Sequence, residues 1–262
     1  MDAWTPAVGA EAAASQALYE LLARALGYGG NQDAMETLAR ALPLHVIDAV
    51  SQGRESYALA ALRLAAGRDA REAVPGLRRS LRAHGVRPPV VETHAWRSGR
   101  VRAVNGIDLR LAQLAASVRG LASRHWLVRL EAALAEQGPL HAAVLPGVFD
   151  FLPPARPAAA AAGERSREIL LNVIAPFLLA YGRNREEERL CRAASALYHR
   201  LHPAPRNAKL DALAVQFTLP SELHGYMQQG LIELHDGLCV PGLCSECLVG
   251  RAMWGRGGKR GR

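Results

Sequence analysis

The stretch "LYELLARALGYGGNQDAMETLARALP", residues 18–43, decides the fold class. Its apolar residues recur every three or four positions on both sides of a glycine-rich centre, which is typical of two amphipathic helices joined by a turn. Gly27 is placed to end the first helix and Asn31 to cap the second, which Pro43 then stops. The residues expected to face the core are Leu18, Tyr19, Leu22, Leu26, Met35, Leu38, Ala39 and Leu42. The stretch predicts a helix hairpin.

A similar pattern, "LLAYGRNREEERLCRAASAL", occupies residues 178–197. It repeats the apolar helix, the Tyr-Gly turn, the asparagine and the second amphipathic helix. Either an internal duplication or the ordinary use of Gly and Asn between helices would explain this similarity. The spacings after the two asparagines differ. Hydrophobic residues make up 50% of the chain but aromatic residues only 5%. Because alanine and leucine are strong helix formers, we predict a mostly α-helical, multi-helix fold built of helix hairpins.

One region departs from this pattern. Residues 86–104, "VRPPVVETHAWRSGRVRAV", contain prolines, β-branched residues and an Arg-Ser-Gly-Arg turn, so they predict a small β-hairpin. The full domain organisation expected is a disordered leader (1–14), a helical half (15–152), a Pro/Ala-rich linker (153–165), a second helical half ending in a cysteine knuckle (166–250) and a basic disordered tail (251–262).

The composition limits the cellular compartment and the kinds of binding partner that we expect for this protein. No stretch approaches the roughly 18 uncharged apolar residues that cross a bilayer, and the first residues lack the pattern of a signal peptide. We therefore expect a cytoplasmic protein with no membrane partner. The formal charge is +8, nearly all of it from arginine, since Lys209 and Lys259 are the only lysines. That charge permits contact with nucleic acid, although a biased codon usage gives the same composition.

Three of the four cysteines fall within nine positions, at Cys239, Cys244 and Cys247. In a reducing compartment such clustered thiols favour a metal site over disulfides. Tetrahedral zinc and a four-iron cluster each need four protein ligands, so one is missing. Cys191 is the first candidate for the fourth ligand, and His235 and His224 are the alternatives. The sequence predicts one zinc ion or one iron–sulfur cluster at this knuckle and does not separate the two.

The C-terminus beyond the knuckle carries no acidic residue from residue 251 onward. Its glycines disfavour a helix, and a basic, glycine-rich tail of this kind can hold single-stranded nucleic acid through its phosphates. The candidate nucleic-acid-binding residues are Arg251, Arg256, Lys259, Arg260 and Arg262. A solvated end without a partner is the competing interpretation.

Several segments together resemble a family of bacterial proteins filed as domain of unknown function 2851. They are the stretch at 18–43, "RAVNGIDLRLAQLA" (102–115), "ILLNVIAPFLLAYG" (169–182) and "QQGLIELHDGLC" (228–239) with the cysteines that follow. Two prolines of the family's element at 102–115 are replaced here by Ala103 and Ile107. Longer members of the family carry, upstream of these segments, a region that resembles a nuclease-like domain. We expect this chain to begin after that region.

No catalytic signature is found in the sequence, and neither lysine follows an Asp/Glu-x pair as a nuclease of that type requires. We therefore expect an uncharacterised, non-catalytic accessory or interaction module with a structural metal site, associated with nucleic acid. One alternative is an iron–sulfur component of a nucleic-acid-processing enzyme. Another is a split-gene fragment that needs a nuclease-like partner supplied in trans.

Overall fold

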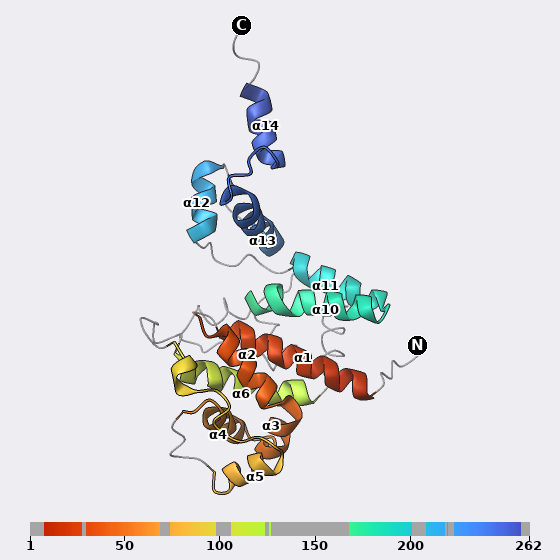
Figure 1. The fold of residues 1–262 in the computed structure, drawn as a ribbon. Helices are drawn as coiled ribbons and strands as arrows, with labels where there is room; N and C mark the ends of the chain where they lie inside the picture. Colours follow the sequence, from red (N-terminus) through yellow and green to blue (C-terminus); the bar gives the residue numbers. More distant parts are fainter. Residues whose placement is uncertain are drawn as a thin grey trace.

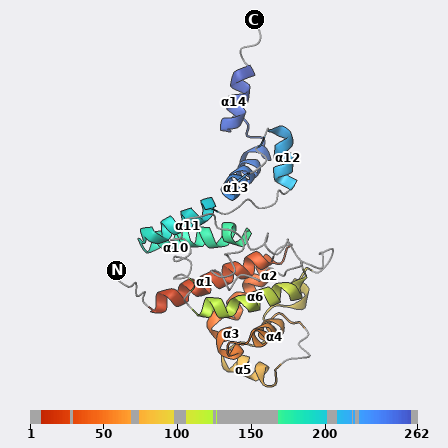
Figure 2. The same ribbon diagram turned by 180° about the vertical axis from the view of Figure 1, so that it is seen from behind.

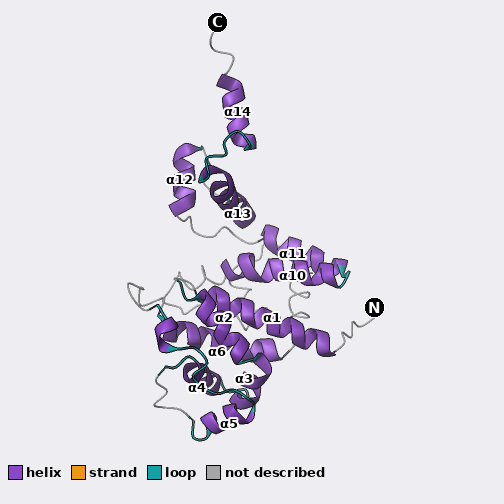
Figure 3. Cartoon of the chain, in the orientation of Figure 1, coloured by secondary structure: helices purple, strands orange, loops and turns teal. Residues whose placement is uncertain are grey.

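The computed structural model describes residues 8–27, 30–68, 74–97, 106–123, 126, 168–200, 208–217, 219 and 223–257. All regular structure in these ranges is helical, and they contain no strand (Figure 3). The prediction of a mostly α-helical, multi-helix fold is confirmed. The expected linker at 153–165 lies outside the described residues.

The N-terminal part of the fold is a bundle of six helices (Figure 1). Their bounds are α1 Val8–Leu26, α2 Gln32–Ala41, α3 Leu44–Ser51, α4 Glu55–Ala65, α5 Leu77–Ala83 and α6 Ile107–Ala122. The hairpin predicted from residues 18–43 is α1 packed on α2. Helix α1 begins at Val8, earlier than the start expected at Ser15, and so extends into the stretch expected to be a leader.

A second hairpin, α10 (Ala175–Asn184) with α11 (Glu188–Arg200), covers the bundle, and its two helices make the most extensive helix–helix contact of the described fold (Figures 1 and 2). Gly182 permits this approach, because a Cβ there would lie 2.9 Å from the Cβ of Leu190 and 3.1 Å from the sulfur of Cys191. The second hairpin predicted from the sequence is therefore confirmed.

One hydrophobic core joins the bundle to the second hairpin. It runs from Leu18 in α1 to Leu197 in α11 and includes Trp126, whose indole N–H donates to the hydroxyl of Ser15 at 3.3 Å. The core thus includes residues from both sides of the expected linker. The packing changes after α11, since none of the described residues beyond 200 belongs to this core.

The last helices are α12 (Ala208–Gln216), α13 (Gly225–Leu234) and α14 (Leu248–Gly257), which extend away from the bundle in both views (Figures 1 and 2). Among the side chains whose burial is described from residue 208 onward, the buried apolar ones are Leu210, Leu213, Leu223 and Cys247. Large apolar side chains such as Val215, Val240 and Leu248 are exposed here. The described side chains of this part of the chain therefore bury less apolar surface than those of the bundle.

The expected β-hairpin at 86–104 is wrong for the part that the structure describes. Residues 86–97 form irregular chain with bends and a short 3-10 helix, η1 (Thr93–Ala95), and residues 98–105 lie outside the described ranges. Backbone N–H groups of Val90 and Val91 donate to the carbonyl of Ala65, and the indole of Trp96 donates to Ala66 at 2.9 Å. The segment is a strap across the end of α4, because these three groups bond to a helix C-terminus and not to a neighbouring strand.

Two π-helical turns interrupt the helices, η3 (Leu170–Ile174) before α10 and η4 (His235–Cys239) after α13. A proline follows each one closely, Pro176 and Pro241. Because proline has no N–H and clashes with the carbonyl four residues earlier, it disturbs the α-helical ladder, and a wider turn accommodates it. No described helix is long and apolar enough to span a bilayer.

Candidate metal centre and basic C-terminus

The cysteine cluster is built on the turn that follows α13. The N–H of Val240 donates to His235 at 2.8 Å and that of Leu243 donates to Leu238 at 2.8 Å, both five residues back along the chain. Gly242 reverses the chain with φ of 74°, a conformation that a side chain disfavours. The turn therefore brings the chain back beneath Cys239.

The second half of the turn leads directly into α14. The N–H of Cys247 donates to Leu243 at 3.2 Å, and that of Arg251 donates to Cys247 at 2.9 Å. Gly250 lies so close to the backbone of Cys244 that any Cβ at this position would collide with the Cys244 carbonyl. Helix α14 is thus fixed to the cysteines through backbone contacts.

All four cysteines are free thiols. Burial raises the pKa of Cys239, and the charges of Cys247 and Cys244 raise it further. These contributions indicate that Cys244 and Cys247 are both near enough to Cys239 to influence its charge. Cys247 is the most buried of them, at 6% exposure.

No group of three or more Cys, His, Asp or Glu side chains in the described ranges is already arranged to hold a metal ion. The donor set itself suits one, because thiolates bind zinc and iron–sulfur clusters and three of them share one turn. Coordination would draw these side chains together, as metal binding does when it is coupled to folding.

Cys191, the first candidate for the fourth ligand, lies elsewhere. Its thiol contacts the carbonyl of Leu179 at 4.0 Å and faces Gly182, inside the α10–α11 hairpin. The structure does not bring Cys191 to the cluster. His224 is also separate, since its ring stacks on Tyr226 at the start of α13, with ring centroids 5.9 Å apart.

His235 lies at the start of η4, and its ring Nδ1 is 2.8 Å from Oδ1 of Asp236. The other oxygen of Asp236 pairs with the ammonium of Lys209 in α12. The hydrogen bond with Lys209, followed by that with His235, lowers the pKa of Asp236, so its carboxylate is charged. Sequence reasoning missed Asp236 and Lys209, because nothing local links residues so far apart.

The basic C-terminus begins inside α14. Arg251 is exposed, and Arg256 lies in the same helix. The helix reaches Gly257, within the stretch expected to be a disordered tail. Lys259, Arg260 and Arg262 lie outside the described residues.

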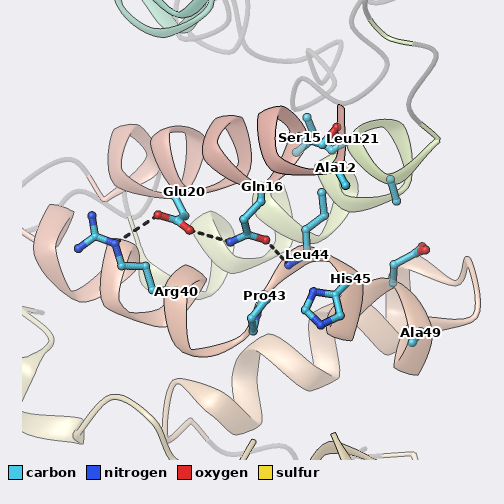
Figure 4. A pocket seen from close by; sticks show the side chains of 12 residues that line it. Ala12, Ser15, Gln16, Glu20, Arg40, Pro43, Leu44, His45, Ala49 and Leu121 are labelled. Carbon is cyan, nitrogen blue, oxygen red and sulfur yellow. Dashed lines mark hydrogen bonds and ion pairs between the residues drawn. The ribbon is translucent and has the colours of Figure 1, made fainter. Parts of the chain in front are cut away.

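A hollow of about 530 Å³ lies between α1, α2, α3 and α6 (Figure 4). A chain of polar contacts crosses it: Arg40 donates to Glu20 at 3.2 Å, and Gln16 donates to the other oxygen of Glu20 at 2.7 Å. Gln16 in turn accepts the N–H of Leu44 at 2.8 Å. The polar groups in this row, from Arg40 to the N–H of Leu44, are thus paired with one another. They serve to join α1, α2 and α3, and the hollow needs no ligand to explain them.

Comparison with known proteins gives one match. A family described as a protein of unknown function, DUF2851, matches residues 10–207. The match covers the bundle and the second hairpin but ends before α12, so the cysteine turn lies beyond it. No curated protein and no solved structure matches the chain.

Proposed function

The chain belongs to the DUF2851 family of proteins of unknown function, and we propose that it acts as a non-catalytic accessory module whose C-terminal segment is held by a metal on cysteine thiolates. The metal ligands are Cys239, Cys244 and Cys247. The observation that supports the proposal is the turn itself, which carries three free thiols within nine residues directly before α14.

The metal has a structural task in this proposal. Among the described side chains of α12 to α14 few apolar ones are buried, so the hydrophobic burial seen there contributes little to stability. A bound metal stabilises the folded form by the free energy of its binding and would compensate for the small core. Zinc closed by four protein ligands supplies no reaction, in keeping with an accessory role.

The same turn would present a basic surface to nucleic acid. Arg251 follows the cysteines by one helical turn and is exposed, and its backbone is bonded to Cys247. With Arg256, Lys259, Arg260 and Arg262, it places five cations after a metal-held anchor. Cations of this kind bind the phosphates of single strands without reading sequence.

Metal content tests the first part. The full chain, purified without oxygen, is analysed for zinc and iron, and we expect about one zinc per chain. Cys244→Ser with Cys247→Ser should remove the metal and lower the melting temperature. Equal metal content in this variant and the wild type would overturn the proposal. Visible absorption from a bound iron–sulfur cluster would instead support the alternative, an iron–sulfur component of a nucleic-acid-processing protein.

Fluorescence anisotropy with a labelled single-stranded oligonucleotide tests the second part. If all five cations contact phosphates, log Kd should rise with log salt with a slope of about 3.5, from roughly 0.7 per contact. Arg251→Gln with Arg256→Gln should weaken binding and reduce the slope. The matched control is Arg79→Gln with Arg82→Gln, which removes two exposed charges from α5. Equal losses of affinity in the two double variants would indicate that the oligonucleotide responds to the overall charge of the protein and does not bind the C-terminus specifically.

A further inference from the structure

We infer that His235 is the fourth ligand, binding the metal through Nε2, and that Asp236 and Lys209 hold its ring in place; this rests on the proposed metal site. Three cysteines leave a tetrahedral site one ligand short. The residue that completes it decides whether the site is all-thiolate or mixed, and which helices the metal ties together.

Cys191 is excluded by its surroundings. Its sulfur contacts Gly182 and the Leu179 carbonyl within the α10–α11 hairpin. Only glycine leaves room for the sulfur at position 182. Bringing this thiol to η4 would require the best-packed helix pair of the described fold to open. Because such a rearrangement would be costly, we assign Cys191 a role in packing and not in metal binding.

His224 is excluded by distance. It precedes α13, whereas the cluster follows the other end of that helix. A helix of 10 residues is about 15 Å long at 1.5 Å per residue. Its ring is also occupied, since it stacks on Tyr226 with an interplanar angle of 15°.

His235 meets the requirements that the other two fail. It opens the π-helical turn that Cys239 closes, so the two side chains lie four residues apart on neighbouring positions of one turn. The His235 side chain is 21% exposed, which leaves it partly sheltered but reachable.

The orientation of the ring is the second observation. Nδ1 of His235 is engaged by Asp236 at 2.8 Å, which leaves Nε2 as the nitrogen available to a metal. Histidine ligands commonly donate their other ring N–H to a carboxylate, which fixes the tautomer and strengthens the ligand. Here the carboxylate is itself anchored by Lys209, so a chain Lys209–Asp236–His235 would link α12 to the metal. A surface ion pair alone would explain the contacts of Asp236 with Lys209 and His235, whereas a metal ligand also needs the Nε2 that this arrangement leaves unengaged.

Cobalt substitution tests the ligand set in the full-length protein. Apoprotein is titrated with cobalt(II), whose visible spectrum distinguishes three sulfurs and one nitrogen from four sulfurs, and zinc affinity is measured by competition with a chromophoric chelator. We expect a mixed-ligand spectrum for the wild type. His235→Ala should weaken zinc binding by more than 100-fold and change the spectrum. His235→Cys should restore tight binding with an all-thiolate spectrum.

Asp236→Asn separates positioning from ligation. It should keep the mixed-ligand spectrum and lose about 10- to 100-fold in zinc affinity, as removal of a partner behind a ligand does. Cys191→Ser and His224→Ala are the matched controls and should keep both spectrum and affinity. Circular dichroism of each variant checks that the helices remain.

The outcomes separate this inference from the proposed function. If the wild type binds neither cobalt nor zinc, the metal site itself is wrong. If the wild type binds metal and His235→Ala retains the wild-type spectrum and affinity, the site stands and the inference about His235 falls. A changed spectrum in Cys191→Ser would overturn it in favour of Cys191.

Discussion

The side-chain carbonyl of Gln16 in α1 accepts the backbone N–H of Leu44, the first residue of α3, at 2.8 Å. Helix α3 begins after Pro43, which has no side chain able to cap it. The first N–H groups of a helix have no partner within the helix, so a distant residue supplies the cap. The same amide donates to Glu20, and Glu20 accepts from Arg40. One glutamine thus joins α1 to the start of α3 and, through Glu20, to α2.

Gln16→Ala should therefore destabilise the protein by about 1–2 kcal/mol, the usual cost of losing a helix cap and its partner bond. Chemical denaturation followed by circular dichroism measures the loss. Gln32→Ala is the matched control, because Gln32 begins α2 and makes no side-chain hydrogen bond to any described residue. If the two variants lose the same stability, the cap from α1 contributes nothing specific.

Asn31 holds the strap on the helix hairpin. Its side-chain amide donates to the carbonyl of Arg97 at 3.1 Å, and its carbonyl accepts the Arg97 N–H at 2.7 Å. Asn31→Ala leaves both backbone groups unpaired, so a loss of about 2–3 kcal/mol is expected. Asn184 occupies the corresponding place in the second hairpin, but it is exposed. Asn184→Ala should change the unfolding free energy by less than about 0.5 kcal/mol, and a similar effect of both substitutions would contradict this account.

These cases show how far the sequence could predict the fold. The hairpins at 18–43 and 178–197 were predictable, because apolar spacing and the glycine turn are local properties. The partner of Asn31 was not: the sequence indicated a helix cap, yet its side chain makes no capping bond and binds Arg97. The prolines and valines of 86–97 suggested strands because extended chain looks alike in a strap and in a hairpin.

For the candidate site, the spacing of Cys239, Cys244 and Cys247 predicted three ligands from one tight turn. The structure places them from the end of η4 to the residue before α14, and no group of three metal-binding side chains is arranged in the described ranges. The fourth ligand of the proposed site could not be assigned from the sequence, because Cys191 has the right chemistry and its place inside the α10–α11 hairpin is a tertiary feature. The pairing of Asp236 with Lys209 depends on how α12 lies beside η4. Such contacts follow from tertiary packing and leave no local pattern.

Tyr19 offers a test of the core. Its side chain is fully buried, and its hydroxyl has no hydrogen-bond partner among the described residues. An unpaired buried hydroxyl costs about 1–3 kcal/mol, so Tyr19→Phe should raise the free energy of unfolding. Thermal and urea denaturation measure the change, and a loss of stability would show that the hydroxyl is bonded after all.

The same residue predicts a pH dependence. Burial, and secondly the charge of Glu20, raise the pKa of Tyr19 above its ordinary value. The native state therefore keeps a proton that the unfolded chain releases above about pH 10, so wild-type stability should fall as pH rises through that region. Tyr19→Phe lacks this group and should show a shallower fall between pH 9 and 11. Identical slopes would mean that Tyr19 does not contribute.

Two glycines near the cysteine turn allow a test of how closely α14 and the cluster depend on each other. At Gly250 a Cβ would collide with the Cys244 carbonyl, whereas at Gly230 in α13 it would meet no atom within 4 Å. Gly250→Ala should therefore push α14 off the turn, lowering metal affinity and the melting temperature. Gly230→Ala should stabilise α13 by up to about 1 kcal/mol, since alanine has a higher helix propensity than glycine.

Both variants add one methyl group to a helical glycine, so a general effect of the substitution would appear in both. Zinc competition and thermal melts check the pair. Equal behaviour of the two variants would mean that the backbone contact between Gly250 and Cys244 does not couple the helix to the cluster.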